Sequence, residues 1–354
     1  MVDVEQSRSM PKVADHWKAI ALVALLGVAS GGLWQVYGGL ETDARQSQTI
    51  ESCTTITDPG RYVLTADVTD SEAGICIRIR SANVILVGRG HRIDGVGAFG
   101  TAGVVARSNT DRPLENVTVR NVTVTDWDDG IRYIDIVDGA VVGTTTSNNR
   151  VGLSLLNARD NRLADNVARG NRLRGISLFE SSTNNTVVNN TATDNALFGI
   201  HLVEAGARNN TLVANTASNN EFGIVIIGAH DNAVMGNTAN GNRIAGIWLS
   251  AARDNRIAHN TVSNRFYGIF LADLSSGNAV SDNVVASNAV GVRLRSSDGN
   301  RIANNSVSAS SDTAILLISS DDNVVLGNVG SNNARDVTLI RSTDNLLVNN
   351  TVSG

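Results

Sequence analysis

Three aspartates that lie close together in the chain are the first candidates for chemistry: Asp126, Asp128 and Asp129. Two carboxyl groups that flank a sugar linkage can act as general acid and as base or nucleophile in its hydrolysis. Carboxylate oxygens are also the usual ligands of calcium. A solvated acidic turn has the same pattern. The three residues are therefore catalytic candidates, and the sequence otherwise predicts no cofactor, with calcium as the alternative.

A second acidic pair consists of Glu180 and Glu204, which follow the same Gly-Ile-x-Leu element in successive copies of a repeated unit. If the copies stack at the spacing of neighbouring strands, about 4.8 Å, the two carboxylates approach each other and can share a cation. The units that contain them are 24 and 25 residues long, and this extra length would separate them. Both glutamates are kept as candidate binding residues.

Soft and imidazole side chains, which copper prefers, do not form a predicted cluster. His201, His230 and His259 occupy three different positions within their units, so we expect them to remain apart. The three methionines of the chain are scattered as well. The sequence therefore predicts no metal site.

The chain has two cysteines, Cys53 and Cys76, and both precede the regular repeats. An even pair predicts one disulfide if the chain lies in an oxidising compartment outside the cytoplasm. Two buried free thiols are the alternative.

A repeat of 22 to 25 residues positions most of these side chains, and a fixed period of this kind determines the fold. A typical unit has an Asn, a second Asn five residues later, often a third after about five more, and then Gly-Ile-x-Leu. The first Asn or Asp of successive units stands at Asn116, Asp138, Asn161, Asn185, Asn210, Asn232, Asn255, Asn278, Asn300, Asn323 and Asn345.

Each unit contains three short segments in which apolar and polar residues alternate, such as 256–258, 261–263 and 269–271. Alternation with a period of two predicts strands, and no segment of a unit is long enough for a helix. Asn suits the turns because it tolerates the left-handed backbone region and bonds locally. The sequence thus predicts an all-β, single-stranded right-handed parallel β-helix, with three strands per coil and about eleven regular coils.

The third strand of each unit carries an unusual outer face. If Ile and Leu of Gly-Ile-x-Leu point inward, the x residue and the residue after Leu point outward. These positions are largely apolar or aromatic, and further aromatics lie at the adjacent turn. An exposed patch of this kind marks a ligand or partner surface, unless another segment covers it or the register is shifted by one. The predicted binding residues are Phe179, Phe198, His201, Phe222, Trp248, Tyr267 and Phe270.

The N-terminal residues 19–40 are uncharged and mostly apolar, long enough to span a bilayer, and preceded by basic residues. We expect a cytoplasmic tail at 1–18, a signal anchor at 19–40, a linker or cap at 41–52, N-terminal coils at 53–115 and regular repeats at 116–354. The β-helix then lies outside the cytoplasm on a single-pass membrane protein. Secretion after signal cleavage is the alternative.

The charge and composition exclude two classes of protein. The net charge of -5 and the pI of about 5.6 leave no basic surface of the kind that binds nucleic acid. A hydrophobic content of 42% argues against disorder.

The units resemble the right-handed β-helix repeats of the family that includes the periplasmic NosD protein, and those of carbohydrate-binding and sugar-hydrolase domains. The segments 53–64, 76–77 and 88–95 are similar to the front end of exported archaeal members. The resemblance covers about residues 53–354. It implies the fold, and because this repeat serves binding, enzymatic and structural proteins alike, it implies no single function.

A β-helix hydrolase of the polygalacturonase kind would need several acids and a histidine on neighbouring coils. Residues 109–111 and Asp128-Asp129 have the order of two such motifs, but 148–150 read Asn-Asn-Arg where Gly-His-Gly is needed. The leading hypothesis is therefore a non-catalytic surface protein that binds a polysaccharide or a cell-surface protein along the third-strand face. The alternatives are a polysaccharide hydrolase or lyase, and a structural rod or metal-maturation protein. The C-terminal unit lacks its third strand, so a second copy of the chain is a further candidate partner there.

Overall fold

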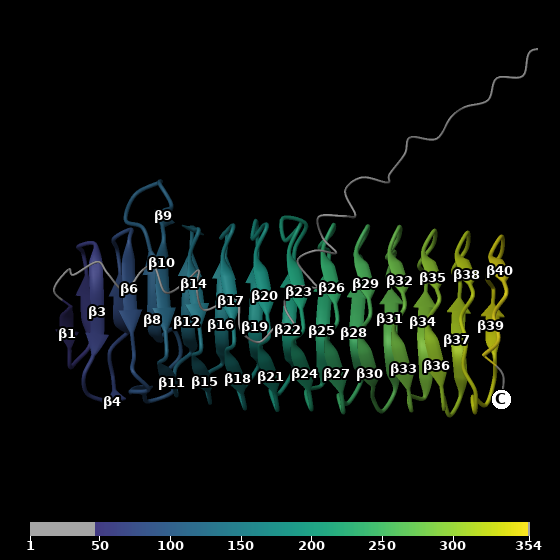
Figure 1. The fold of residues 1–354 in the computed structure, drawn as a ribbon, viewed down its shortest axis with the longest axis horizontal. Helices are drawn as coiled ribbons and strands as arrows, with labels where there is room; N and C mark the ends of the chain where they lie inside the picture. Colours follow the sequence, from purple (N-terminus) through teal and green to yellow (C-terminus); the bar gives the residue numbers. More distant parts are fainter. Residues whose placement is uncertain (1–46, 353–354) are drawn as a thin grey trace, which may run out of the picture. The chain divides into compact units, whose positions relative to one another are not determined.

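The computed structural model describes residues 47–352 of the 354-residue chain. Every regular element among them is a β-strand (Figure 1). None of the described residues belongs to a helix that is long and apolar enough to cross a bilayer. The expected cytoplasmic tail at 1–18 and signal anchor at 19–40 lie outside the described residues.

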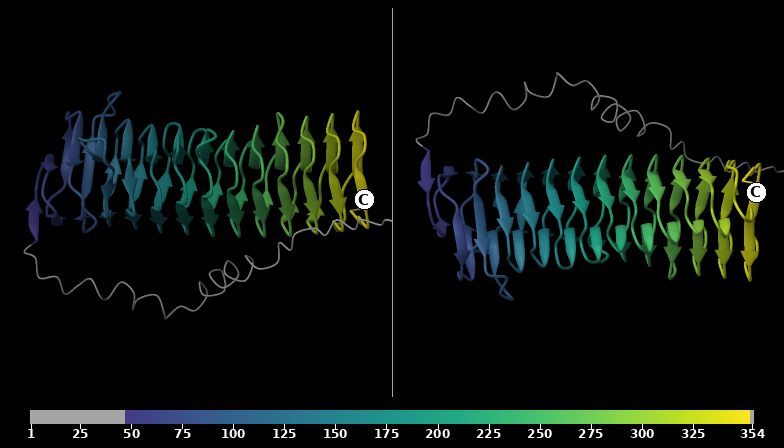
Figure 2. Two further views of the ribbon diagram at one scale, coloured as in Figure 1. Left: turned by 90° about the horizontal axis from the view of Figure 1, so that it is seen from above. Right: turned by 90° about the horizontal axis from the view of Figure 1, so that it is seen from below.

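The strands form three long parallel sheets, and each coil between residues 60 and 318 contributes one strand to each sheet (Figures 1 and 2). Sheet A has 14 strands, sheet B has 13 and sheet C has 11. Strands that are hydrogen-bonded neighbours belong to successive coils, as Leu163, Val187 and Leu212 show in sheet A. The described residues are therefore a parallel β-helix, as the repeat predicts.

Sheet A is formed by strands β1 Gln48–Ile50, β3 Gly60–Leu64, β6 Val84–Val87, β10 Val117–Arg120, β14 Ala140–Val142, β17 Arg162–Ala164, β20 Thr186–Val188, β23 Thr211–Val213, β26 Ala233–Met235, β29 Arg256–Ala258, β32 Ala279–Ser281, β35 Arg301–Ala303, β38 Val324–Leu326 and β40 Leu346–Val348. Strand β1 lies within 41–52, the segment expected to be a linker or cap, and it pairs with β3.

Sheet B is formed by strands β2 Thr54–Ile56, β5 Ile75–Ile79, β8 Ala102–Arg107, β12 Asp129–Ile134, β16 Val151–Leu156, β19 Arg174–Phe179, β22 Phe198–Val203, β25 Phe222–Ile227, β28 Ala245–Ser250, β31 Tyr267–Ala272, β34 Val290–Arg295, β37 Thr313–Ile318 and β39 Val337–Ile340.

Sheet C is formed by strands β4 Val68–Ser71, β7 Arg92–Gly95, β11 Thr123–Thr125, β15 Thr145–Ser147, β18 Val167–Arg169, β21 Thr191–Thr193, β24 Thr216–Ser218, β27 Thr238–Asn240, β30 Thr261–Ser263, β33 Val284–Ala286 and β36 Ser306–Ser308. A small extra pair joins β9 Leu114–Glu115 and β13 Ile136–Val137.

Each of the three turns of a regular coil carries a buried asparagine ladder. In one ladder the Oδ1 of Asn190 accepts from the backbone N–H and the Nδ2 of Asn166, at 3.0 and 2.9 Å. Asn190 in turn donates both groups to Oδ1 of Asn215. The ladders satisfy backbone groups that the turns would otherwise leave unpaired in the interior. The repeated asparagines therefore have a structural role, since they hydrogen-bond each coil to the next at its turns.

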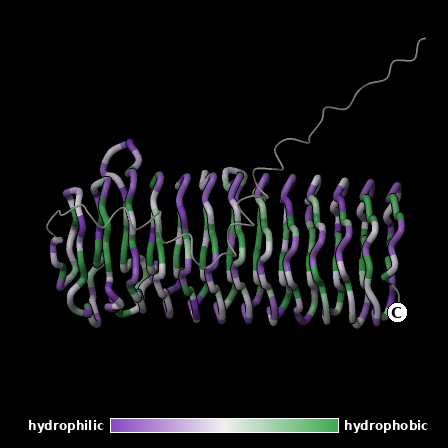
Figure 3. Tube along the Cα trace, in the orientation of Figure 1, coloured by the Kyte–Doolittle hydropathy of each residue, from purple (hydrophilic) through white to green (hydrophobic). Residues whose placement is uncertain are grey.

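The interior is narrow and filled by aliphatic side chains from all three sheets, and the hydropathy colouring shows apolar strands between polar turns (Figure 3). The Ile and Leu of the Gly-Ile-x-Leu elements point into this core, as with Ile200 and Leu202, which are fully buried. Larger side chains fill the N-terminal coils, where Trp127 and Tyr133 are also fully buried.

The glycine of the Gly-Ile-x-Leu element is required by a close approach. A Cβ on Gly199 would lie 2.7 Å from the carbonyl oxygen of Gly223 and 2.7 Å from Nδ2 of Asn220 in the ladder. The strand pairing also skips this position, since Phe198 pairs with Phe222 and Ile200 with Ile224. The glycine therefore points inward beside an inward-pointing Ile, which interrupts the alternation of the strand and leaves Phe198 on the outer face.

The expected disulfide is confirmed, since Cys53 and Cys76 are bonded to each other. Cys76 is buried in strand β5, and Cys53 immediately precedes β2, the partner of β5 in sheet B. The bond therefore joins two consecutive coils at the N-terminal end of the described residues.

Candidate functional site

The outer face of sheet B carries a row of rings across five consecutive coils, which we call the aromatic face. Strand pairing places its members side by side, so that Ser177, His201, Val225, Trp248 and Phe270 occupy one column on β19, β22, β25, β28 and β31. The ring residues of the aromatic face are Phe179, Phe198, His201, Phe222, Trp248, Tyr267 and Phe270, which are the predicted binding residues.

The rings of the aromatic face contact one another in two groups. Phe198 stacks on His201 at a centroid distance of 4.6 Å, and Phe222 stacks on Trp248 at 4.8 Å. Phe198 and Phe222 lie 5.7 Å apart and link the two stacks. In the second group, Tyr267 lies 4.9 Å from Phe270. Such pairs stabilise by about 0.5–1.5 kcal/mol beyond the burial of their area.

Mutual contact leaves the aromatic face only partly accessible. Phe179, Phe222, Trp248 and Tyr267 are half-buried, whereas Phe198 and Phe270 are 8% exposed. His201 is 2% exposed, and burial, with Arg174 adding to it, lowers its pKa to about 3. The imidazole is therefore neutral at physiological pH.

Buried polar atoms without a hydrogen-bond partner gather on this face. They include Oγ of Ser154, Oγ of Ser177 and both ring nitrogens of His201, which follow one another in register on β16, β19 and β22. Nε1 of Trp248 is also unpaired. A buried polar group without a partner costs about 1–3 kcal/mol. These atoms are closed off from solvent, so a polar ligand would satisfy them only where the covering side chains move aside.

Two arginines flank the aromatic face. The guanidinium carbon of Arg174 on β19 lies 5.2 Å from the ring centre of Phe179 and 6.0 Å from that of Phe198. At the other end, Arg293 on β34 lies 4.8 Å from the ring of Tyr267 and 5.1 Å from that of Phe270. Nε of each arginine is buried and unpaired.

Two of the three candidate catalytic aspartates lie beside the Arg174 end. Asp128 and Asp129 are 5% and 8% exposed, and both are ion-paired. Nε of Arg150 donates to Oδ1 of Asp128 at 2.5 Å, and Nη1 of Arg132 donates to Oδ2 of Asp129 at 3.1 Å. Burial raises the pKa of Asp129, against the opposing charges of the two arginines. Asp128 also accepts from the backbone N–H of Gly100, so most of its acceptor positions are occupied.

The remaining acidic candidates do not join this cluster. Asp126 is half-buried in a turn with a positive φ of 61°. Glu180 and Glu204 follow strands β19 and β22, and both are exposed and have positive φ values. They belong to the turns that leave sheet B, beyond the aromatic face.

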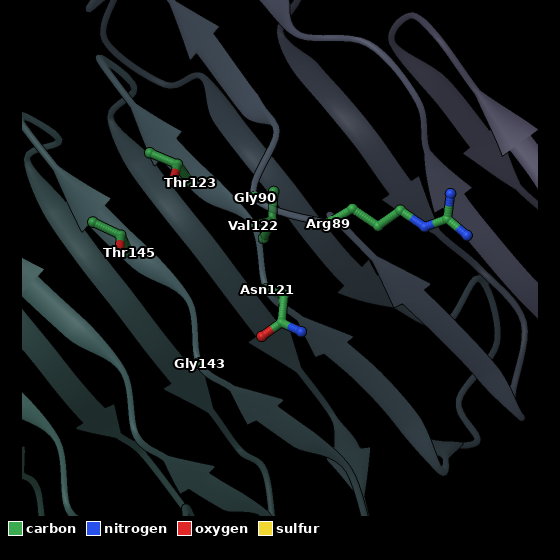
Figure 4. Close-up of a pocket in the computed structure, with 7 residues that line it drawn as sticks. All are labelled: Arg89, Gly90, Asn121, Val122, Thr123, Gly143 and Thr145. Carbon is green, nitrogen blue, oxygen red and sulfur yellow. The ribbon is translucent and has the colours of Figure 1, made fainter. Parts of the chain in front are cut away.

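Two open hollows lie on the described surface. The first, of about 590 Å³, lies between sheets A and C on the N-terminal coils and is lined by Arg89, Gly90, Asn121, Val122, Thr123, Gly143 and Thr145 (Figure 4). The second, of about 240 Å³, lies at the first coil around Ile50 and Tyr62. Neither includes a residue of the aromatic face or of the aspartate cluster.

Sequence reasoning placed Ser177 on the outer face of its strand, as the x residue of its unit, but it did not identify Ser154 or the arginines of this site. The coil register brings together side chains that are 22 to 24 positions apart in the sequence. It thereby makes neighbours of the candidate residues out of Arg132, Arg150, Arg174, Ser154 and Ser177. The signal was present in the repeat, because Arg174 immediately precedes the Gly-Ile-x-Leu element of its unit.

The three parallel sheets, the ladders and the one-sided aromatic surface define a parallel β-helix repeat protein. A family model described as periplasmic copper-binding protein (NosD) matches residues 77–266, 193–311 and 241–354. Together these matches cover more than half of the chain, and the protein therefore belongs to this family. A search of curated proteins found no match.

Solved structures with a similar fold belong to several different kinds of protein. The A-module of mannuronan C-5 epimerase AlgE6 from Azotobacter vinelandii is 16% identical, with a TM-score of 0.57 over 87% of this chain and 80% of that one. The Dettilon tailspike protein is 17% identical, with a TM-score of 0.60 over 82% of this chain and 61% of that one. PfbA, a surface adhesin of Streptococcus pneumoniae, is 12% identical, with a TM-score of 0.53 over 84% of each chain. At these identities the likeness establishes the fold alone.

The copper in the family description does not fit the donors of residues 47–352. No three His, Cys, Asp or Glu side chains among them come together to hold a metal ion. The two sulfurs of Cys53 and Cys76 are in a disulfide. His230 lies against Asp231 at 2.7 Å, His201 is stacked among rings, and His259 is exposed at a turn. These side chains do not converge, so no step of the function is assigned to copper.

Proposed function

We propose that the protein is a non-catalytic, extracytoplasmic surface protein whose aromatic face binds a polysaccharide. The observation that carries the proposal is the outer face of sheet B, where seven rings and several unpaired polar atoms share five consecutive coils. Sugars combine apolar ring faces, which stack on aromatic side chains, with hydroxyl groups, which need donors and acceptors. The composition of the aromatic face suits both.

The disulfide supports the proposed location outside the cytoplasm, because such bonds persist in oxidising compartments. Membrane attachment through residues 19–40 remains part of the proposal.

Binding of the full-length protein and of Trp248→Ala to an array of glycans tests the function. We expect binding to at least one glycan class and a loss of roughly fivefold or more in the variant, because removal of a contacting aromatic costs more than about 1 kcal/mol. Val324→Ala on the outer side of sheet A is a matched control that should bind like the wild type. Absence of binding to every glycan contradicts the proposal.

A hydrolase or lyase is the second candidate, and one observation favours it. Burial raises the pKa of Asp129, as expected for a carboxyl group that must stay protonated to act as a general acid. The ion pairs of Asp128 and Asp129 with Arg150 and Arg132 favour a structural role instead. Breakdown of a bound polysaccharide that disappears in Asp129→Asn would establish the enzyme, and unchanged breakdown would exclude this assignment.

A further inference from the structure

The charged groups of the aromatic face point to the class of its ligand. We propose that the ligand is a linear acidic polysaccharide that lies along the coil axis and places anionic groups at Arg174 and Arg293. This inference rests on the proposed function and names the chemistry of the same site.

Arg174 lies near two ion-paired arginines but has no counter-charge of its own within residues 47–352. Arg132 and Arg150 are paired with Asp129 and Asp128, whereas no carboxylate of the described residues forms an ion pair with Arg174. Its neighbours along the outer column of sheet B are Val151 and Phe198. Burial, and then the charge of Arg150, lowers the pKa of Arg174. An anion bound at this guanidinium would offset both effects.

Unpaired polar atoms lie beside this guanidinium. Arg174 reaches across its own strand to Phe179, and Ser177 lies between the two on the same face. Oγ of Ser177 is fully buried without a partner, as are the nitrogens of His201 on the next coil. The guanidinium can bind the oxygens of a carboxylate or sulfate directly. The hydroxyl and the imidazole can add bonds to a sugar hydroxyl only where the side chains that cover them move aside.

Arg293 has an equivalent environment at the other end of the aromatic face. It lies over the rings of Tyr267 and Phe270 and donates from Nη1 to the hydroxyl of Tyr267. No carboxylate of residues 47–352 is ion-paired with it, in contrast to the nearby Arg295, which contacts Asp273 at 2.9 Å. The two ends of the aromatic face thus repeat the same combination, an arginine without an ion pair beside two rings.

The separation of the two arginines defines the shape of the ligand. Five coil steps lead from β19 to β34, which corresponds to roughly 24 Å at the spacing of neighbouring strands. The rings of Phe198, Phe222 and Trp248 lie between them. A long chain can contact both arginines at once, and linked contacts of this kind bind more tightly than either alone.

Titration of the full-length protein with four polymers tests the inference: polygalacturonate, dextran sulfate, uncharged dextran and polyglutamate. We expect one of the two acidic polysaccharides to bind at least tenfold more tightly than dextran or polyglutamate, and the tighter one distinguishes carboxylate from sulfate. Arg174→Gln and Arg293→Gln should each weaken that binding by roughly tenfold or more, the size of a lost charge-assisted bond. Arg301→Gln, an exposed arginine of sheet A, is the control and should bind like the wild type.

The outcomes separate this inference from the proposed function. Dextran binding as tight as that of the acidic polysaccharides, with both arginine variants unaffected, contradicts the acidic ligand and leaves polysaccharide binding intact. Absence of binding to every polysaccharide contradicts both. Polyglutamate binding of equal strength shows that charge alone is recognised, and this also contradicts the inference. Thermal unfolding of each variant within a few degrees of the wild type ensures that a loss of binding reflects the site.

Discussion

Substitution of a ladder asparagine should cost far more stability than substitution of the asparagine next to it in the sequence. Asn190 is 1% exposed and takes part in a ladder through both its amide atoms. Asn189 is exposed, has a left-handed backbone and forms one side-chain bond, from its Nδ2 to Asp165. The pair Asn190→Ala and Asn189→Gly therefore separates the ladder role from the turn role of this residue type.

The magnitude follows from the bonds that Asn190→Ala removes. Oδ1 no longer accepts from the N–H and the Nδ2 of Asn166, and Nδ2 no longer donates to Leu163, Val188 and Asn215. A typical bond contributes about 0.5–1.5 kcal/mol, and the buried N–H of Asn166, left without an acceptor, adds about 1–3 kcal/mol. We expect the free energy of unfolding to fall by about 3–5 kcal/mol. Asn189→Gly keeps the left-handed conformation and should cost less than about 1 kcal/mol.

Chemical denaturation of the full-length protein, followed by circular dichroism, measures this difference. Each coil of a repeat protein interacts mainly with its two neighbours, so the substitution can also split one cooperative transition into two. Either a lower midpoint or a second, earlier transition meets the expectation. Equal stability of Asn190→Ala and Asn189→Gly would refute the reasoning, because the ladder would then contribute no more than an exposed turn.

Three further predictions concern stability. Burial lowers the pKa of His201 to about 3, so between about pH 6.5 and pH 3 the unfolded chain binds a proton that the folded chain does not. The free energy of unfolding should therefore fall by up to about 1.4 kcal/mol per pH unit as the pH drops through this window. Denaturation at several pH values should show that His201→Phe lacks this contribution, whereas His259→Asn at an exposed turn keeps it. Gly223→Ala would place a Cβ 2.5 Å from the carbonyl oxygen of Gly246 and should lower the free energy of unfolding by about 1–3 kcal/mol. Gly74→Ala, with open space around its Cβ, should be neutral, and thermal unfolding of the two variants measures the difference. Reduction of the Cys53–Cys76 bond, which closes a segment with a sequence separation of 23, should cost about 3 kcal/mol, and the double variant Cys53→Ala with Cys76→Ala should show no response to reductant.

The coil architecture could be predicted from the sequence because each repeated unit contains three alternating segments and three turns. Alternation identifies the strands, asparagines mark the turns, and the spacing of successive units sets the register. The pattern allows two registers, and the full burial of Ile200 and Leu202 confirms the one that points them inward. The membrane anchor at 19–40 stays a prediction.

The composition of the outer face was harder to predict because one residue interrupts the alternation. Strict alternation from His201 on the outside would place Gly199 outside and Phe198 inside. Instead Gly199 points toward the asparagine ladder, and Phe198 stacks on His201. The same break puts Arg174, Phe222 and Tyr267 on the outer face of their coils. A period of two cannot reveal this, since the break arises from contact between Gly199 and the neighbouring coil.

The unpaired charge of Arg174 is, by contrast, readable from the sequence once that break is known. In a stack of parallel coils, the nearest side chains above and below a residue are the ones that occupy its column in the adjacent units. For Arg174 these are Val151 and Phe198, neither of which is an acid. The negative charge of Asp129 raises the pKa of Arg174 and so opposes the lowering by burial and by Arg150. Asp129 lies two coils away, however, and is already paired with Arg132. An acid introduced by Val151→Asp would therefore occupy the place that we assign to the anion of the ligand. This variant should gain an ion pair with Arg174 and lose affinity for acidic polysaccharide, and unchanged affinity would show that the anion binds elsewhere.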